Sequence, residues 1–80
     1  PFKNSLIKLD ASGYDCRIND NGLKNCNKIQ NLDACDNKYI TTCEPFKNTL
    51  IKLDASGICG INNKEIRKCH KIKLHIIFEF

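Results

Sequence analysis

Residues 1–13, PFKNSLIKLDASG, return at residues 45–57 as PFKNTLIKLDASG, and the replacement of Ser5 by Thr49 is the only difference. Near-identity over a block of this length is the signature of an internal repeat. The match extends into a pair of cysteines with nearly the same setting in each copy, Cys16 and Cys26, then Cys59 and Cys69. The sequence therefore predicts one domain, residues 1–80, made of two tandem repeats, residues 1–44 and 45–80.

The repeated block has the pattern of a β-strand. Its apolar residues alternate with Lys8 and Asp10, the period of two that buries one face of a strand. Short apolar runs between Asn, Asp and Gly turns are typical of all-β proteins, whereas residues 32–34, Leu-Asp-Ala, are expected to form at most a helical turn. The sequence predicts a small antiparallel β-sandwich or barrel with five to seven strands. A pseudo-two-fold axis is expected to relate the repeats and to bury four residues together: Ile7, Leu9, Ile51 and Leu53.

Six cysteines in 80 residues predict a disulfide framework formed in an oxidising compartment, so the chain is expected to be secreted. Residues 20–22, Asp-Asn-Gly, have the chemistry of a hairpin turn. A three-residue loop there places Cys16 opposite Cys26 on the neighbouring strand. A two-residue turn shifts the register of the two strands by one residue, so these cysteines would have to pair with other cysteines. The shared spacing favours local pairs: Cys16 with Cys26, Cys59 with Cys69, and Cys35 with Cys43.

The composition of the chain and its lack of known catalytic motifs reduce the number of functional classes to consider. Thirteen basic and nine acidic residues give a net charge of +4, which favours anionic partners. The longest apolar run, residues 76–78, is far too short to span a membrane. No zinc knuckle, glycine-rich phosphate loop, GxSxG or HExxH motif occurs. The sequence therefore predicts no enzyme activity, no metal and no cofactor.

The densest basic segment lies in the predicted final strand, which runs from Ile66 onward. Alternation along this strand places four cationic side chains on one face, where they could bind an anion: Arg67, Lys71, Lys73 and His75. A solvated strand face without a ligand explains the same pattern. At an edge of the sheet, this strand could also pair with a second copy of the chain to form a homodimer.

The repeated block duplicates polar residues as well as apolar ones. Eight candidate binding residues come from the two copies: Lys3, Asn4, Lys8 and Asp10, then Lys47, Asn48, Lys52 and Asp54. Two equivalent binding sites would explain why surface positions recur. A recent duplication that has not diverged explains the recurrence equally well.

In composition, the chain resembles small secreted antifungal proteins, killer toxins and fungal effectors, a resemblance that assigns no role to any residue. The sequence predicts a secreted, non-enzymatic, cysteine-rich binding protein of the toxin, effector or antimicrobial type. Its target is expected to be an anionic surface, a glycan or another protein outside cells, and nucleic acid is not expected. The alternative is a secreted protease inhibitor that presents Lys38, between Cys35 and Cys43, to a trypsin-like pocket.

Overall fold

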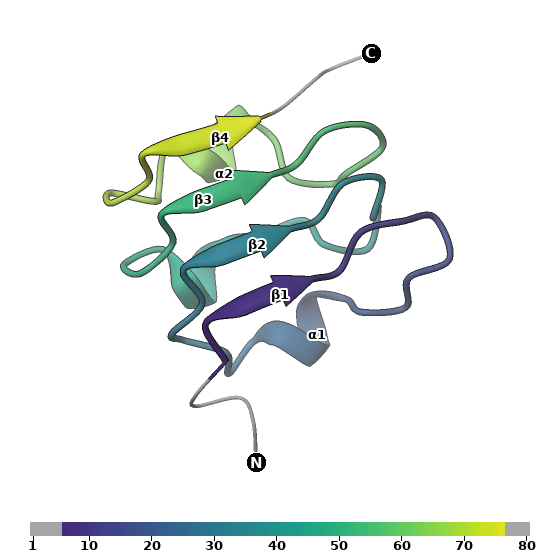
Figure 1. Ribbon diagram of the computed structural model, residues 1–80, viewed down its shortest axis with the longest axis horizontal. Coiled ribbons are helices and arrows are strands. Elements are labelled where there is room, and N and C mark those ends of the chain that lie inside the picture. The colour runs from purple at the N-terminus through teal and green to yellow at the C-terminus, as the bar shows by residue number, and fades with distance from the viewer. Residues whose placement is uncertain (1–5, 77–80) are drawn as a thin grey trace.

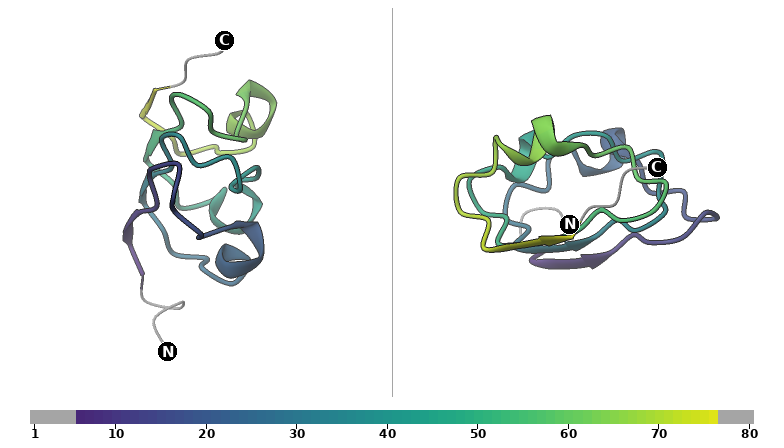
Figure 2. Two further views of the ribbon diagram at one scale, coloured as in Figure 1. Left: turned by 90° about the vertical axis from the view of Figure 1, so that its right-hand side faces the viewer. Right: turned by 90° about the horizontal axis from the view of Figure 1, so that it is seen from above.

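The computed structural model describes residues 6–76 and builds them around a parallel sheet. Its four strands lie side by side in chain order (Figure 1): β1 (Lys8–Asp10), β2 (Asn31–Asp33), β3 (Lys52–Asp54) and β4 (Leu74–Ile76). Three short helical segments separate them: α1 (Asp20–Leu23), the 3-10 helix η1 (Glu44–Phe46) and α2 (Asn63–Ile66). Seen from above, the strands form one side of a flattened ring and the helical segments form the other (Figure 2). None of the helices in the described part of the chain has the length and apolar character needed to cross a bilayer.

The chain therefore winds as a solenoid, in which each coil consists of a strand and the helical segment that follows it. The strands begin at residues 8, 31, 52 and 74, so successive coils are 23, 21 and 22 residues long. We refer to residues 8–30, 31–51 and 52–73 as coils 1, 2 and 3. The 44-residue spacing between the two copies of the repeated block spans two coils, so β2 lies between β1 and β3, which have the same sequence. Because all four strands run in the same direction, the repeats succeed one another along the solenoid and the predicted pseudo-two-fold axis is wrong.

The predicted antiparallel sandwich or barrel is also wrong, because the expected hairpin turn at residues 20–22 and the equivalent segment of the second repeat, residues 63–65, belong to the helices α1 and α2. Asn19 has an extended backbone, and its Oδ1 accepts a hydrogen bond from the N–H of Gly22 at 2.9 Å. Asn62 caps α2 in the same way through the N–H of Glu65, at 3.1 Å. An asparagine in this position satisfies an N–H that the helix itself leaves unpaired. The chain thus crosses to the far side of the molecule instead of returning beside the strand that it has just left.

Apolar side chains from both sides of each coil fill the interior. The sheet contributes the middle leucine of each of the first three strands and the alanine that follows the strand: Leu9, Leu32 and Leu53, with Ala11, Ala34 and Ala55. The far side contributes larger groups, of which Phe46 is 1% exposed and Leu50 is fully buried. The expected burial of Ile7 is wrong, since this side chain is 46% exposed. Ile7 lies at the bend before β1, where its carbonyl oxygen accepts hydrogen bonds from the N–H groups of Gln30 and Asn31.

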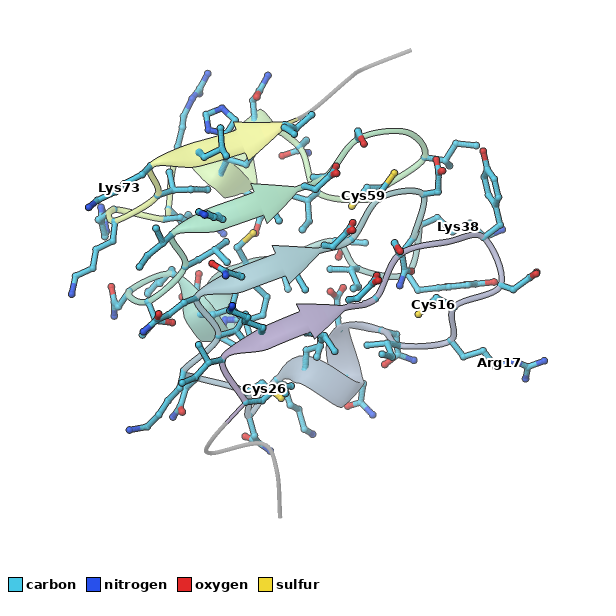
Figure 3. All side chains as sticks on the ribbon, in the orientation of Figure 1. Cys16, Arg17, Cys26, Lys38, Cys59 and Lys73 are labelled. Carbon is cyan, nitrogen blue, oxygen red and sulfur yellow. The ribbon has the colours of Figure 1, made fainter. Side chains whose placement is uncertain are left out.

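The predicted disulfides are not formed, and all six cysteines are free thiols. Figure 3 shows the reason for the first pair: Cys16 lies in the loop beyond the carboxyl end of β1, whereas Cys26 lies beyond α1, near the amino end of the strands. Cys59 and Cys69 are likewise separated by α2, and Cys35 follows β2 whereas Cys43 precedes η1. The prediction of secretion loses the support that disulfides gave it and stays a prediction.

The final strand predicted from Ile66 onward is wrong, because Ile66 is the last residue of α2. Asn62 followed three residues later by Glu65 has the spacing that marks the start of a helix. The strand near this end of the chain is β4, Leu74–Ile76, and it is parallel to β3. Residues 77–80, which the prediction included, lie outside the described residues.

Coil 3 contacts coil 2 closely at Gly60, so a substitution at this residue tests how tightly the two coils pack. A Cβ atom at this position would lie 2.6 Å from Cγ2 of Thr41 and 2.7 Å from the backbone oxygen of Ile40. Because backbone atoms cannot move aside alone, Gly60→Ala should lower the free energy of unfolding by about 1–3 kcal/mol in urea denaturation. Gly22→Ala is the matched control, since its nearest neighbour would be 3.6 Å away in a helix that favours alanine. Equal stability of the two variants would contradict the close stacking of the coils.

Candidate functional site

The outer side of the sheet is the surface that the helical segments do not cover (Figures 1 and 2). Side chains alternate between the two sides of a strand, so the first and last residues of each strand point outward when the middle leucine points inward. The register aligns these outward residues in two rows across the strands: Lys8, Asn31, Lys52 and Leu74, then Asp10, Asp33, Asp54 and Ile76. All eight also line an open groove of about 360 Å³. We call this surface the sheet face.

Three carboxylates, which we call the aspartate row, lie at the carboxyl ends of adjacent strands: Asp10, Asp33 and Asp54. Each Oδ1 accepts a hydrogen bond from the backbone N–H two residues ahead, at 3.0, 3.1 and 3.0 Å respectively. The hydroxyl groups of Ser12 and Ser56 also donate to Oδ1 of their aspartates, at 2.5 and 2.7 Å. Such bonds are those of an Asx turn, and they fix the carboxylates at the corner where each coil leaves the sheet.

The aspartate row concentrates negative charge. The hydrogen bonds from the side chain and backbone of Ser12 lower the pKa of Asp10, which therefore stays ionised at neutral pH. Adjacent strands are about 4.8 Å apart, and like charges on neighbouring strands repel each other. Within residues 6–76, none of the three carboxylates forms an ion pair. The other outward row has a lower charge density, because the neutral Asn31 lies between Lys8 and Lys52.

The structure brings together half of the duplicated residues that the sequence singled out: Lys8, Asp10, Lys52 and Asp54 all lie on the sheet face. Lys47 and Asn48 follow η1 on another part of the surface, and Lys47 forms an ion pair with Glu44 at 2.7 Å. Lys3 and Asn4 lie outside the described residues. The two copies thus contribute to one continuous surface, because their strands belong to the same sheet.

The predicted basic stripe does not lie along one strand. Arg67 follows the last residue of α2, and Lys71 and Lys73 lie in the segment that leads to β4. Figure 3 shows Lys73 beside the amino end of β4. Only His75 belongs to the strand, where its register partner is the inward-facing Leu53. These four residues therefore share no strand face, and the interpretation of the segment as one strand is wrong.

Sequence reasoning missed Asn31 and Asp33, which complete the two outward rows. Residues 32–34 were expected to form a helical turn, but residues 31–33 are β2 and the alanine that follows is buried. The tripeptide Leu-Asp-Ala, which occurs at residues 9–11, 32–34 and 53–55, could have identified β2 from the sequence. These three occurrences mark one coil each.

The described residues offer charge and shape rather than reactive groups. Burial raises the pKa of the thiols of Cys43, Cys59 and Cys69, which are therefore protonated and weakly nucleophilic at neutral pH. Among residues 6–76, no group of three or more His, Cys, Asp or Glu side chains could hold a metal ion.

Fold and surface together define the class as a short solenoid with one strand and one helical segment in each coil. Comparison with family models, with curated proteins and with solved structures gives no match to this chain.

Proposed function

We propose that this protein is a non-enzymatic binding module that recognises a positively charged segment of another protein through the sheet face. The observation that carries the proposal is the aspartate row, three aligned carboxylates on adjacent strands beside an open groove of about 360 Å³. Stacked-repeat proteins commonly use such extended surfaces for binding.

The energetics of the row support a cationic partner. Three like charges on neighbouring strands repel one another, while their turn hydrogen bonds hold the carboxylates in place. Those bonds engage Oδ1, whereas Oδ2 of each aspartate makes no hydrogen bond to another residue within 6–76. Arginine or lysine side chains of a partner would both relieve the repulsion and use the second oxygen.

The β4 end of the sheet face adds an apolar contact. Leu74 is 54% exposed and Ile76 is 41% exposed, and both line the groove beside the charged rows. Apolar anchors surrounded by polar groups are typical of protein interfaces. We therefore propose a partner segment in which basic side chains accompany at least one large apolar side chain.

A fluorescein-labelled peptide with alternating arginine and glycine and one leucine provides the test, with fluorescence anisotropy as the measurement. We expect it to bind, and we expect the same peptide with glutamate in place of arginine not to bind. Changing all three aspartates of the row to asparagine should weaken binding by about tenfold or more, while asparagine can still accept the turn hydrogen bonds.

The matched control is Glu44→Gln, which removes one negative charge from the helical side of the molecule. We expect this variant to bind the arginine peptide as tightly as the unchanged protein does. Unchanged affinity in the triple asparagine variant would refute the proposal, as would equal binding of the arginine and glutamate peptides.

The other partners predicted from the sequence have different support. At the sheet face, the aspartate row favours a cationic target over the anionic one that the net charge suggested. Homodimer formation through β4 stays a proposal, supported by the exposed Leu74 and Ile76, and sedimentation velocity over a range of concentrations tests it. For the protease inhibitor, Lys38 lies in a tight turn, whereas a protease cleft takes an extended segment. Secretion and a toxin or effector role stay predictions from the composition.

A further inference from the structure

The loops that follow β1 and β2 bring the two tyrosines of the chain to one hollow. Tyr14 and Tyr39 line this hollow, which has a volume of about 730 Å³. Tyr14 is 67% exposed and Tyr39 is 49% exposed, so both rings leave apolar area in contact with water. Figure 3 shows Arg17 and Lys38 on these loops, beyond the carboxyl ends of the strands and away from Lys73. The hollow lies outside the groove of the sheet face and shares no lining residue with it.

One buried side chain holds both loops. Asn37 is 2% exposed, and its Nδ2 donates hydrogen bonds to the carbonyl oxygens of Ala11 and Ile18 at 2.8 and 3.0 Å. These two carbonyl groups lie at the ends of the loop that carries Tyr14. Oδ1 of Asn37 accepts the N–H of Tyr39 at 2.9 Å. The backbones of the loops that carry the two rings are therefore held in place before a ligand arrives, which reduces the entropy lost on binding.

Cys16 and three polar side chains complete the lining of the hollow, the polar ones being Asp15, Arg17 and Asn19. Oδ1 of Asn19 accepts the hydrogen bond that caps α1, which leaves its amide nitrogen to donate. Asp15 and Arg17 form no ion pair with each other or with any other residue in the described range. Donors and acceptors thus surround the rings, and among the lining residues one carboxylate accompanies one guanidinium.

We propose that this hollow binds a saccharide. A pyranose ring presents an apolar face of C–H groups, which stacks on an aromatic ring, and hydroxyl groups at its edge, which pair with planar polar side chains. Lys38 lies 5.4 Å from the centre of the Tyr39 ring, so Tyr14 is the more accessible stacking surface. The carboxylate of Asp15 in the lining favours a sugar over a single-stranded nucleic acid, whose phosphates require a basic groove. This inference is independent of the proposed function of the sheet face.

The chain supplies its own probe, because it contains no tryptophan and both of its tyrosines line the hollow. We expect titration with at least one of three neutral oligosaccharides, chitohexaose, cellohexaose or mannohexaose, to change the tyrosine emission in a saturable way. Affinity should stay nearly constant when the NaCl concentration rises, since no net charge is paired. A glycoprotein before and after enzymatic removal of its glycans then distinguishes a protein-linked glycan from a free oligosaccharide as the source.

Variants assign the binding to the hollow, with isothermal titration calorimetry as the measurement. Tyr14→Ala should weaken saccharide binding by about tenfold or more, whereas Tyr14→Phe keeps the ring and should retain most of it. Ile58→Ala is the matched control, because Ile58 is a 53% exposed apolar residue in a loop of coil 3 that does not line the hollow. The proposal fails if no saccharide of the panel changes the emission or if Tyr14→Ala binds as tightly as the unchanged protein. Salt-sensitive binding of oligothymidylate through the same tyrosines would also overturn it.

Discussion

Phe46→Ala is expected to lower the free energy of unfolding by about 3–5 kcal/mol, a large part of the total stability of a domain of this size. Among residues 6–76, Phe46 is the largest fully buried side chain, at 1% exposure, and it fills the interior of coil 2 from the helical side. Removal of the ring leaves a cavity between coils that each depend on their neighbours for burial. Urea denaturation followed by far-ultraviolet circular dichroism measures the loss.

Two further variants keep this prediction testable even when Phe46→Ala does not fold. Phe46→Leu should fold and lose about 1–2 kcal/mol, because leucine fills most of the same space. Tyr14→Ala removes an aromatic ring that is 67% exposed and should change stability by less than about 0.5 kcal/mol. A Phe46→Ala variant as stable as Tyr14→Ala would show that the aromatic ring is not packed between the coils.

Asn37→Asp is expected to have the second largest effect, a loss of about 2–4 kcal/mol at neutral pH. The change replaces the donor of two hydrogen bonds, to Ala11 and Ile18, by a carboxylate that faces the same carbonyl oxygens. Burial of this charge would raise the pKa of the new carboxyl group above its value in the unfolded chain. The folded state then binds more protons than the unfolded state, so stability relative to the unchanged protein should recover as pH falls.

Thermal denaturation between about pH 4 and pH 7 measures this dependence. Asn25→Asp is the control, since Asn25 is exposed in the segment after α1 and the same chemical change there should have little effect at either pH. A loss for Asn37→Asp that does not diminish in acid would contradict the assignment of buried donor bonds to Asn37.

The sequence located part of the fold and part of the sheet face. Alternation around Lys8 and Asp10 identified β1, and the duplication carried that assignment to β3. The same duplication brought Lys52 and Asp54 into consideration. These inferences succeeded because the side-chain period of a strand is local and does not depend on which strands lie beside it.

The direction of the neighbouring strands could not be read from the same pattern. Alternation states which residues share a face, but a parallel and an antiparallel neighbour both satisfy it. The helices that make the sheet parallel, α1 and α2, have four residues each and are too short to show a helical period. Their asparagine caps resemble hairpin turns in sequence, because the same residue types favour both.

Coil 2 was not recognised from the sequence for a different reason. Its Leu-Asp-Ala at residues 32–34 is followed by Cys35 and Asp36, whereas the other two copies are followed by Ser-Gly. The near-identity of residues 1–13 and 45–57 made the longer period more visible than the period of a single coil. The third carboxylate of the row, Asp33, was missed together with its strand.

Stacking in whole coils bears on how such a chain evolves. Each coil contacts mainly the coil before it and the coil after it, so insertion of complete coils keeps every existing interface intact. A tandem duplication of a 44-residue unit therefore yields a folded product in a single genetic event, with no intermediate that must repack its interior. The duplication also adds two strands to the exposed sheet. A broader surface for binding is therefore present before any point mutation changes it.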